Sequence, residues 1–440
     1  MPTKGHCIMK IIVAGAGCGG LQAAKLLAAK GHEVTIYEKN TEEEVGFDWR
    51  DEIDYKLFAD SDIKLPKGSY RADITHFVPT FSDNGIPIDI PKENRDWVVE
   101  RRVLVKEMIA DALAKGAKIN YGMTVKKLIL KGEKVSGVLI GGEKVYCDIV
   151  IDACGINSPL RKSFPEEFGI TKEPGENDYY SAFRGVFDFY PERLPSKQRK
   201  KIYIKFMGQG GISKCICHPD EYADIFVSKL GRMSRFEFET MMRQLRIENQ
   251  IIGYEMYFGG KFIKIPSRYP LCKMVAEGYA AIGDSAFMAN PITCQGVADS
   301  IKAGNLLAAA INEGGSASVR SLWKYQTDFF KQIGWEYFAA DITKRFILSC
   351  KSEEIRFLLE GGLFTKDELK MIAQGKGIIL STSSIIDKLK RGRKKFKFVL
   401  ALVTFLNKGK KATSLAKSIP AKYDKGKIDS WQKSIEKLYE

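Results

Sequence analysis

The chain has 440 residues, of which 45% are hydrophobic and 28% charged, a composition that is typical of folded globular proteins and excludes wholesale disorder. Its length fits one large two-part enzyme or two to three domains. It contains no run of about 18 uncharged apolar residues, and residues 1–10 lack an apolar stretch, so neither a membrane-spanning helix nor a cleaved export signal is expected. The nine cysteines are scattered, which indicates reduced thiols in a cytoplasmic protein.

The net charge of +15 is concentrated near the C-terminal end. Residues 385–440 hold 16 Lys and Arg against 5 Asp and Glu, which accounts for +11 of it. Because a nucleic-acid-binding protein would spread its basic side chains over a wider surface, we expect no nucleic-acid partner.

The predicted elements begin with a βαβ unit. Residues 10–14 are a β-branched strand, residues 21–30 have helical apolar spacing, and residues 34–38 are strand-like again. A helix is expected over residues 101–115, ended by Gly116. Residues 134–140 and 145–152 then predict a hairpin that leads into a buried strand.

The pattern changes in the middle of the chain and then returns. Alternating runs at 181–189, 201–206 and 222–229 predict an antiparallel sheet, with a helix near 235–248. The βα pattern resumes at residues 279–284 and 297–311, and helical patterns dominate after residue 319. This order predicts an α/β domain into which a second sheet is inserted.

A glycine-rich turn follows the first predicted strand. Gly15 permits a tight turn, Gly17 lets the backbone approach a pyrophosphate, and Gly20 lets the helix pack close to the strand. The helix N-terminus offers N–H groups to phosphates. Glu38 ends the second strand, where its carboxylate can accept hydrogen bonds from ribose hydroxyls and would repel a 2′-phosphate. This turn therefore predicts a dinucleotide other than NADP, with Cys18 and Lys39 as neighbouring contacts.

A second group of residues indicates which dinucleotide is bound. Residues 277–284 predict a strand that ends in Gly283-Asp284, and Pro291 precedes a helix that starts near Gly296-Val297. A flavin needs such a second site, because its ribityl chain and ring lie far from its adenosine. Asp284 could accept hydrogen bonds from ribityl hydroxyls, and the helix could direct its positive end toward the ring.

Both motifs resemble the geranylgeranyl reductase family within the aromatic-hydroxylase-like superfamily of FAD-dependent proteins. The match covers GxGxxGLxAAxxL at residues 15–27 and the later Gly283-Asp284. The resemblance implies FAD as the cofactor and an arginine contact to it from the helix near residue 101, for which Arg102 is the better match and Arg101 the alternative.

Residues 147–161 (CDIVIDACGINSPLR) resemble the middle motif of these flavoproteins, which implies cofactor contacts from Ala153 and Gly155. Hydroxylases place an acid before this glycine, whereas Cys154 stands there in this chain and favours the reductase branch. Residues 265–271 (IPSRYPL) and the long helical region after Trp323 also resemble that branch.

The resemblance implies an α/β fold: a Rossmann-like FAD-binding domain, an inserted antiparallel substrate domain and a C-terminal helical region. The FAD-binding parts are expected at 1–65, 101–164 and 266–315, the substrate domain at 66–100 and 165–265, and the helical region at 316–440. The implied activity is hydride transfer from reduced FAD to a C=C bond of a hydrophobic or lipid substrate, with NAD(P)H or a ferredoxin as electron donor.

Two departures keep alternatives open. Residues 45–52 contain no cysteine, and residues 213–219 (SKCICHP) replace the aromatic-rich run of the family's substrate sheet. A reductase of a smaller polar substrate, a monooxygenase that uses NAD(P)H and O2, and a non-catalytic flavoprotein therefore remain alternatives.

Candidate catalytic and substrate residues lie outside the cofactor motifs. Asp48, Trp49 and Asp51 occupy a loop that the family pattern places near the flavin, and an acid there could supply the proton that alkene reduction requires. The candidate substrate-lining thiols are Cys215, Cys217 and Cys294. No metal is expected, because three potential ligands within residues 215–218 cannot wrap a tetrahedral ion.

The C-terminal region carries a basic and apolar stretch. Residues 388–397 contain seven Lys and Arg, the apolar run 398–406 follows, and three more lysines lie in 408–411. One interpretation is that residues 385–411 lie peripherally on an anionic membrane on its inner face, and another is that the apolar side packs on the domain. The third interpretation is that this stretch binds nucleic acid or an acidic protein partner such as a ferredoxin.

Overall fold

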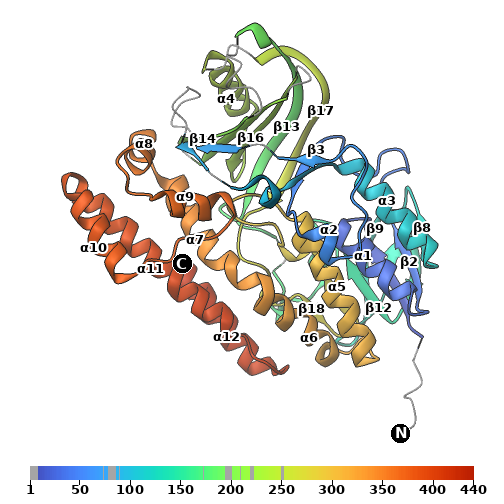
Figure 1. Cartoon of the computed structure of the whole chain (residues 1–440). Coiled ribbons are helices and arrows are strands. Elements are labelled where there is room, and N and C mark those ends of the chain that lie inside the picture. Colours follow the sequence, from blue (N-terminus) through green and yellow to red (C-terminus); the bar gives the residue numbers. More distant parts are fainter. Residues whose placement is uncertain are drawn as a thin grey trace.

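A computed structural model describes residues 8–72, 74–77, 86–88, 90–171, 173–193, 201–208, 210–218, 222–248 and 252–440. Within these residues two large sheets lie side by side, with a block of helices along one flank (Figure 1). The predicted fold class is confirmed, because a parallel sheet, separate antiparallel sheets and C-terminal helices are all present.

The first sheet has six strands in the order β18-β19-β12-β1-β2-β8. All neighbours are parallel except β18, which is antiparallel to β19. Its strands are β1 (Lys10–Ala14), β2 (Glu33–Tyr37), β8 (Lys118–Asn120), β12 (Ile149–Asp152), β18 (Val275–Ala276) and β19 (Tyr279–Ala281). The central strands are almost wholly apolar and buried, as expected for a parallel sheet that is covered on both faces.

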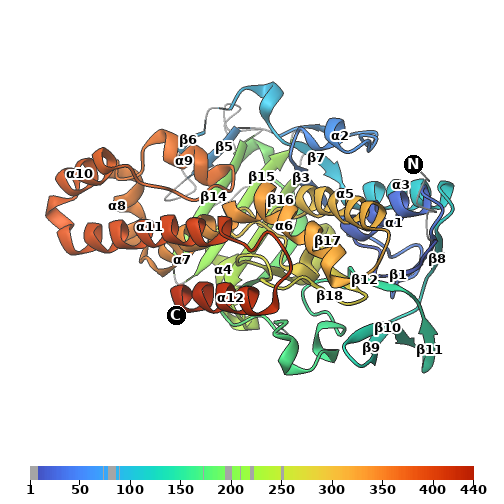
Figure 2. The same ribbon diagram turned by 90° about the horizontal axis from the view of Figure 1, so that it is seen from below.

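Three helices cover one face of this sheet and a small antiparallel sheet covers the other (Figure 2). The helices are α1 (Cys18–Ala28), α3 (Arg101–Ala114) and α5 (Val297–Gly314). The small sheet is β9 (Val125–Lys131), β10 (Lys134–Ile140) and β11 (Glu143–Tyr146). The predicted strand over 145–152 is thus two strands: β11 belongs to the small sheet, and the chain turns at Cys147-Asp148 to enter β12.

The second large sheet has the order β17-β13-β16-β15-β14-β5-β6. Its strands are β5 (Ile74–Phe77), β6 (Ile86–Pro87), β13 (Tyr179–Phe189), β14 (Lys201–Gly208), β15 (Gly211–His218), β16 (Tyr222–Leu230) and β17 (Ile252–Pro266). Helix α4 (Arg235–Glu248) packs on one face through an apolar cluster that includes Phe183, Phe187 and Leu245. The opposite face is turned toward the first sheet.

A three-stranded sheet and a short helix lie between the two halves. The sheet has the order β3-β7-β4, formed by β3 (Arg50–Ile53), β7 (Trp97–Glu100) and β4 (Tyr70–Arg71). Helix α2 (Leu57–Asp60) follows β3. Residues 66–100 therefore contribute strands both to this connector and, through β5 and β6, to the second large sheet.

The C-terminal helices pack on two apolar cores: the first and last of them on the core of the six-stranded sheet, and most of those between around a second core. They are α6 (Val319–Phe329), a π-helical turn at Phe330–Gly334, α7 (Trp335–Ser349), α8 (Ser352–Glu360), α9 (Lys366–Ala373), α10 (Thr382–Arg391), α11 (Phe396–Lys417) and α12 (Lys425–Tyr439). The apolar run 398–406 lies in α11, where Val399, Leu402, Val403 and Leu406 are buried. Its apolar face is thus occupied by the protein itself.

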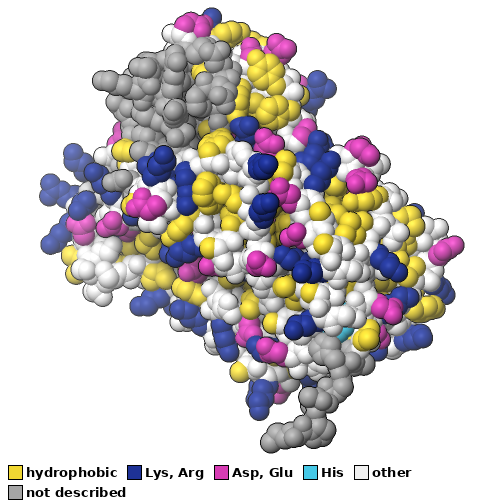
Figure 3. Space-filling view, turned by 45° about the vertical axis from the view of Figure 1, so that its right-hand side comes forward, with side chains coloured by type: hydrophobic (Ala, Val, Ile, Leu, Met, Phe, Trp, Pro, Cys, Tyr) yellow, Lys and Arg dark blue, Asp and Glu magenta, His cyan; other side chains and the backbone are white. Residues whose placement is uncertain are grey.

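No helix within the described residues is long and apolar enough to cross a membrane. Basic side chains gather along the left-hand edge of the surface in Figure 3, on the side where Figure 1 places α10 and α11.

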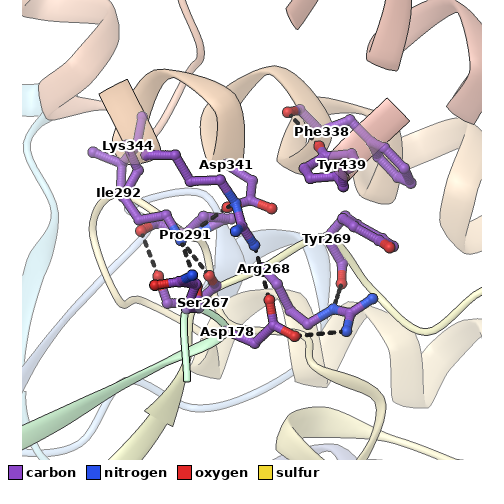
Figure 4. Close-up of polar contacts among 12 residues, drawn as sticks. Asp178, Ser267, Arg268, Tyr269, Pro291, Ile292, Phe338, Asp341, Lys344 and Tyr439 are labelled. Atoms are coloured by element: carbon purple, nitrogen blue, oxygen red, sulfur yellow. Dashed lines mark hydrogen bonds and ion pairs between the residues drawn. The ribbon is translucent and has the colours of Figure 1, made fainter. Parts of the chain in front are cut away.

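A buried ionic cluster joins the C-terminal helices to both halves (Figure 4). Asp178, just before β13, accepts hydrogen bonds from Arg268 Nη1 at 2.9 Å and Arg345 Nη2 at 2.8 Å. Asp341, fully buried on α7, pairs with Arg345 at 2.9 Å and Lys344 at 2.8 Å. The cluster thus holds together three segments that are distant in sequence: the residues just before β13, residues 266–268 and helix α7.

Candidate functional site

One cavity of about 1420 Å³ extends from the carboxyl ends of β1 and β12 to the inner face of the second large sheet. The turns at Gly15 and at Gly283 both line it, as do β3, the residues just before β7 and the start of α5. Ligands of open α/β sheets bind at the carboxyl ends of the strands, so the position of this cavity is the one expected for a nucleotide.

The first turn is shaped by the close approach of two strands. Gly15 has φ +94°, and a Cβ atom there would lie 2.5 Å from the carbonyl oxygen of Ala153. A Cβ atom on Gly20 would lie 2.8 Å from the Cβ atom of Ala153. Gly17 caps α1 without a side-chain hydrogen bond, so the first N–H groups of the helix are left for a phosphate.

Glu38 is held in place beside this turn. Its Oε2 accepts a hydrogen bond from the Ala16 N–H at 2.8 Å, and its Oε1 accepts from the backbone and side-chain N–H groups of Asn40 at 2.9 and 2.7 Å. Glu38 and its neighbour Lys39 both line the cavity. The carboxylate is therefore positioned where the sequence predicts contact with a ribose.

Asp152 links the two turns and is a residue that the sequence motifs did not single out. It ends β12, is fully buried, and accepts hydrogen bonds from the hydroxyls of Tyr279 at 2.8 Å, Ser285 at 2.9 Å and Ser158 at 2.5 Å, and from the Cys154 N–H at 3.0 Å. The only sequence signal is an acid at the end of an apolar strand.

The second turn also opens into the cavity. Gly283 has φ +64° and begins a 3₁₀ turn after the strand that pairs with β12, and Asp284 is the second residue of this turn. Burial raises the pKa of Asp284 to about 6, although the charges of Arg101 and Arg161 lower it. Among the described contacts its carboxylate has no hydrogen-bond partner in the protein, so a ligand hydroxyl would satisfy it.

Helix α5 starts at the same end of the cavity. Gly296 and Val297 line it, and Gly296 caps the helix without a side-chain hydrogen bond. Pro291 does not line the cavity. Its carbonyl instead accepts a hydrogen bond from the Ser267 hydroxyl at 3.1 Å, which holds the loop that precedes α5.

The arginine of α3 that faces the cavity is Arg101, not Arg102. Arg101 is the first residue of the helix, its N–H donates to the Trp49 carbonyl at 3.0 Å, and its Nη1 donates to Asp51 Oδ2 at 3.0 Å. Arg102 is the next residue of the helix, and its Cα and Cβ atoms lie close to Gly46. The better sequence match is thus rotated away from the site, because successive helical residues point about 100° apart.

The loop around residue 49 places only part of the predicted trio at the cavity. Trp49 is buried, stacks on Phe47 with ring centroids 4.1 Å apart, and lines the cavity together with Asp51. Asp51 pairs with Arg101 at 3.0 Å and Arg184 at 3.1 Å. Asp48 does not line the cavity.

The three candidate thiols are separated. Cys294 lines the cavity, with φ +61° and a pKa raised to about 12 by burial. Cys215 instead packs in the apolar cluster beneath α4, on the face of the second large sheet opposite the cavity. Its predicted role as a substrate contact is not supported by this placement. The Cys217 side chain lies outside the described residues.

Charged side chains on the substrate side of the cavity were also not singled out by any sequence motif. Arg184 on β13 forms ion pairs with Asp224 at 2.7 Å and with Asp51 at 3.1 Å. Lys214 on β15 pairs with Glu52 at 2.6 Å. Each ion pair joins elements that are far apart in sequence, so no local sequence motif predicts these pairs.

The residues present fit FAD. A Cβ atom at Gly15 would fill the first turn, the half-buried carboxylate of Asp284 has no hydrogen-bond partner among the described contacts, and one cavity connects the two turns. A mononucleotide would occupy only one of the two turns.

Comparisons with known proteins agree with this geometry. Residues 13–68 match the model of the NAD(P)-binding Rossmann-like domain. The chain is 23% identical to the digeranylgeranylglycerophospholipid reductase of Haloferax volcanii over 77% of this chain and 84% of the relative, and 21% identical to that of Sulfolobus acidocaldarius over 97% and 96%.

Solved structures share the fold. A geranylgeranyl bacteriochlorophyll reductase-like protein from Thermoplasma acidophilum aligns with a TM-score of 0.71 and 17% identity over 90% of this chain and 99% of that one. A flavin-dependent brominase aligns with a TM-score of 0.61 and 17% identity over 83% and 93%. The resemblance predicted from the sequence is thereby confirmed: the chain is an FAD-dependent oxidoreductase, and it is similar to reductases of the geranylgeranyl type.

Proposed function

We propose that the protein saturates C=C bonds of an amphiphilic isoprenoid lipid, with FAD as its hydride carrier. The observation that carries the proposal is the single cavity that joins both cofactor turns to the inner face of the second large sheet. The relatives named digeranylgeranylglycerophospholipid reductase support the choice of substrate class.

The adenosine and pyrophosphate would be held at the first turn, and the ribityl chain and ring at the second. The proposed cofactor contacts are Gly15, Gly17, Cys18, Gly20, Glu38, Lys39, Arg101, Ala153, Gly155, Gly283, Asp284, Gly296 and Val297, all of which line the cavity. Bound and reduced, FAD supplies the hydride.

The protein side chains orient the reactants and exclude water. The stacked Phe47 and Trp49 form a rigid apolar wall, and Asp51 holds Arg101 and Arg184 in place through an ion pair with each. An unactivated alkene offers no carbonyl to take up charge, so a dry wall and a fixed proton donor matter more than usual.

The cavity wall on the substrate side suits a chain with an apolar body and a polar end. Its aliphatic and aromatic members include Ile88, Ile204, Ile212, Phe226, Ile263, Ile265, Ile292 and Ile333. Basic side chains at its rim include the exposed Lys261 and Lys264, which would favour an anionic headgroup.

We further propose weak contact with an anionic membrane through residues 385–411. The buried apolar face of α11 is unavailable for this contact, but Ile386, Phe396 and Leu400 are each about half exposed among basic neighbours. Each Lys or Arg near such a surface contributes about 1 kcal/mol. This contact would bring the enzyme to lipid substrates.

Anaerobic mixing tests the reaction. FAD-loaded protein reduced with dithionite should be reoxidised by digeranylgeranylglycerophospholipid in detergent micelles without O2, with saturated lipid detected by mass spectrometry. Reoxidation that requires O2 and yields a hydroxylated product would establish the monooxygenase alternative instead. If the bound flavin is reduced by dithionite but transfers electrons neither to the lipid nor to O2, the result would support a non-catalytic flavoprotein.

The electron donor is tested separately. We propose NAD(P)H or a ferredoxin, and the rate of flavin bleaching with NADH, NADPH or reduced ferredoxin under anaerobic conditions separates them. The predicted repulsion between Glu38 and a 2′-phosphate concerns the FAD site and leaves a transient NADPH contact open.

A further inference from the structure

Asp96 is a carboxyl group on the cavity wall that no cofactor motif accounts for. It immediately precedes β7, and it lines the cavity. Gln295 Nε2 donates a hydrogen bond to Asp96 Oδ2 at 2.9 Å. Gln295 in turn precedes Gly296, the N-cap of α5, which places Asp96 at the end of the cavity proposed for the flavin ring.

The charges that face Asp96 leave it without a cation of its own. Glu52 on β3 and Asp54, the residue after β3, carry the same sign of charge as an ionised Asp96, and Lys214 on β15 is the cation that faces it. Lys214 is already paired with Glu52 at 2.6 Å, and Asp54 is paired with Lys302 at 3.0 Å. Within the described residues Asp96 forms no ion pair.

Burial therefore dominates the ionisation of this carboxyl group. Desolvation, together with Glu52 and Asp54, raises the pKa of Asp96 to about 6, against the lowering effect of Gln295 and Lys214. A group of this kind retains a proton at a pH where ordinary carboxyl groups have lost theirs.

The other acids near the cavity are less suited to donate a proton. Asp51 is engaged in ion pairs with both Arg101 and Arg184. Asp48 does not line the cavity. The pKa of Asp284 is also raised to about 6, but Asp284 lies at the second cofactor turn, where ribityl hydroxyls would occupy its carboxyl group. Asp299 accepts a hydrogen bond from the Tyr337 hydroxyl at 2.6 Å.

We propose that Asp96 is the proton donor of alkene reduction and that Gln295 positions its carboxyl group. This inference rests on the proposed function. One alkene carbon accepts the hydride, by which the reduced flavin is oxidised, and the other carbon accepts the proton of Asp96. The C=C π bond, the N–H bond of the reduced flavin that would supply the hydride and the Asp96 O–H bond break, two C–H bonds form, and the resulting carboxylate regains a proton from solvent.

The test compares wild-type protein, D96N and E93Q, because Glu93 is an exposed carboxylate three residues away on the same segment. All three should bind FAD to the same occupancy and be reduced by dithionite. In anaerobic single turnovers with digeranylgeranylglycerophospholipid micelles, flavin reoxidation should be at least about 100-fold slower in D96N and unchanged in E93Q, since a positioned general acid contributes about 10²- to 10⁴-fold.

A second readout does not depend on turnover. A carboxyl group whose pKa is raised by folding stabilises the folded state at low pH and loses that contribution as the pH rises through its folded value. The free energy of unfolding of wild-type protein should therefore fall relative to that of D96N between pH 4 and about pH 6, whereas E93Q should follow wild-type protein.

The outcomes are distinguishable. Reoxidation of D96N at the wild-type rate would overturn the role of Asp96 and leave the proposed function standing. Wild-type protein that no alkene reoxidises would overturn both. If D96N folds poorly, D96E provides the second variant, and it should retain a measurable part of the rate only if a carboxyl group is required there.

Discussion

The cofactor half and the substrate half of the cavity are built by different means. At the cofactor half, backbone approach decides the shape: Gly15 and Gly20 leave no space for a Cβ atom, and Asp152 is satisfied by hydroxyls and an N–H group. At the substrate half, ion pairs between distant elements decide it, as with Arg184 and Asp224 or Lys214 and Glu52. Backbone recognition leaves short motifs in a sequence, whereas long-range ion pairs leave none.

The largest expected effect is on the substrate half. Arg184→Met should lower the free energy of unfolding by about 3–5 kcal/mol, because Asp224, which is nearly inaccessible, would lose its cation, while Asp51 would keep only its pair with Arg101. Urea denaturation measures the change. Arg235→Met is the matched control, since the pair of Arg235 with Glu239 is exposed, and it should change stability by less than about 0.5 kcal/mol. Equal changes in the free energy of unfolding for the two substitutions would contradict the view that the buried ion pair stabilises the fold more than the surface pair does.

Gly15→Val should be the most damaging substitution on the cofactor half. Its Cβ atom would meet the Ala153 carbonyl oxygen at 2.5 Å in a backbone conformation with φ +94°, so we expect a loss of about 3 kcal/mol and loss of bound FAD. Gly31→Val is the control, because Gly31 has φ +88° but a Cβ atom there would meet nothing within 4 Å, which leaves backbone strain alone at about 1–2 kcal/mol. Flavin absorbance per chain and thermal unfolding measure both effects; FAD retained by Gly15→Val would contradict the proposed turn.

A smaller effect separates two neighbouring arginines. Arg101→Ala should weaken FAD binding by about 10- to 100-fold, as removal of one charged contact of about 1.5–3 kcal/mol would do, while Arg102→Ala should leave affinity within about threefold. Fluorescence titration of the FAD-free protein measures both values. If Arg102→Ala instead weakened FAD binding more than Arg101→Ala, the FAD contact would belong to Arg102, as the sequence pattern favoured.

Much of the fold was predictable, because local patterns reported it. The βαβ opening, the helix at α3, the inserted antiparallel sheet and α4 were all expected from periodicity and turn residues. The division of residues 145–152 between β11 and β12 was not, since an apolar run does not reveal that its two parts pair with different strands.

The site was predictable in the same uneven way. Sequence spacing could not tell Arg101 from Arg102, because helix rotation about the core decides which one faces the cavity. Alternation along a strand showed that Cys215 faces one side of β15, but only the packing of α4 decided that this side is the core.

By itself the sequence determined the cofactor class and the turns proposed to hold it, because a phosphate-binding turn needs particular glycines at fixed spacing whatever the rest of the chain does. Only the tertiary structure decided which arginine and which carboxyl groups line the substrate side, and that the apolar face of α11 is covered. These features depend on desolvation and on contacts between residues far apart in the sequence, and a local stretch of sequence predicts neither.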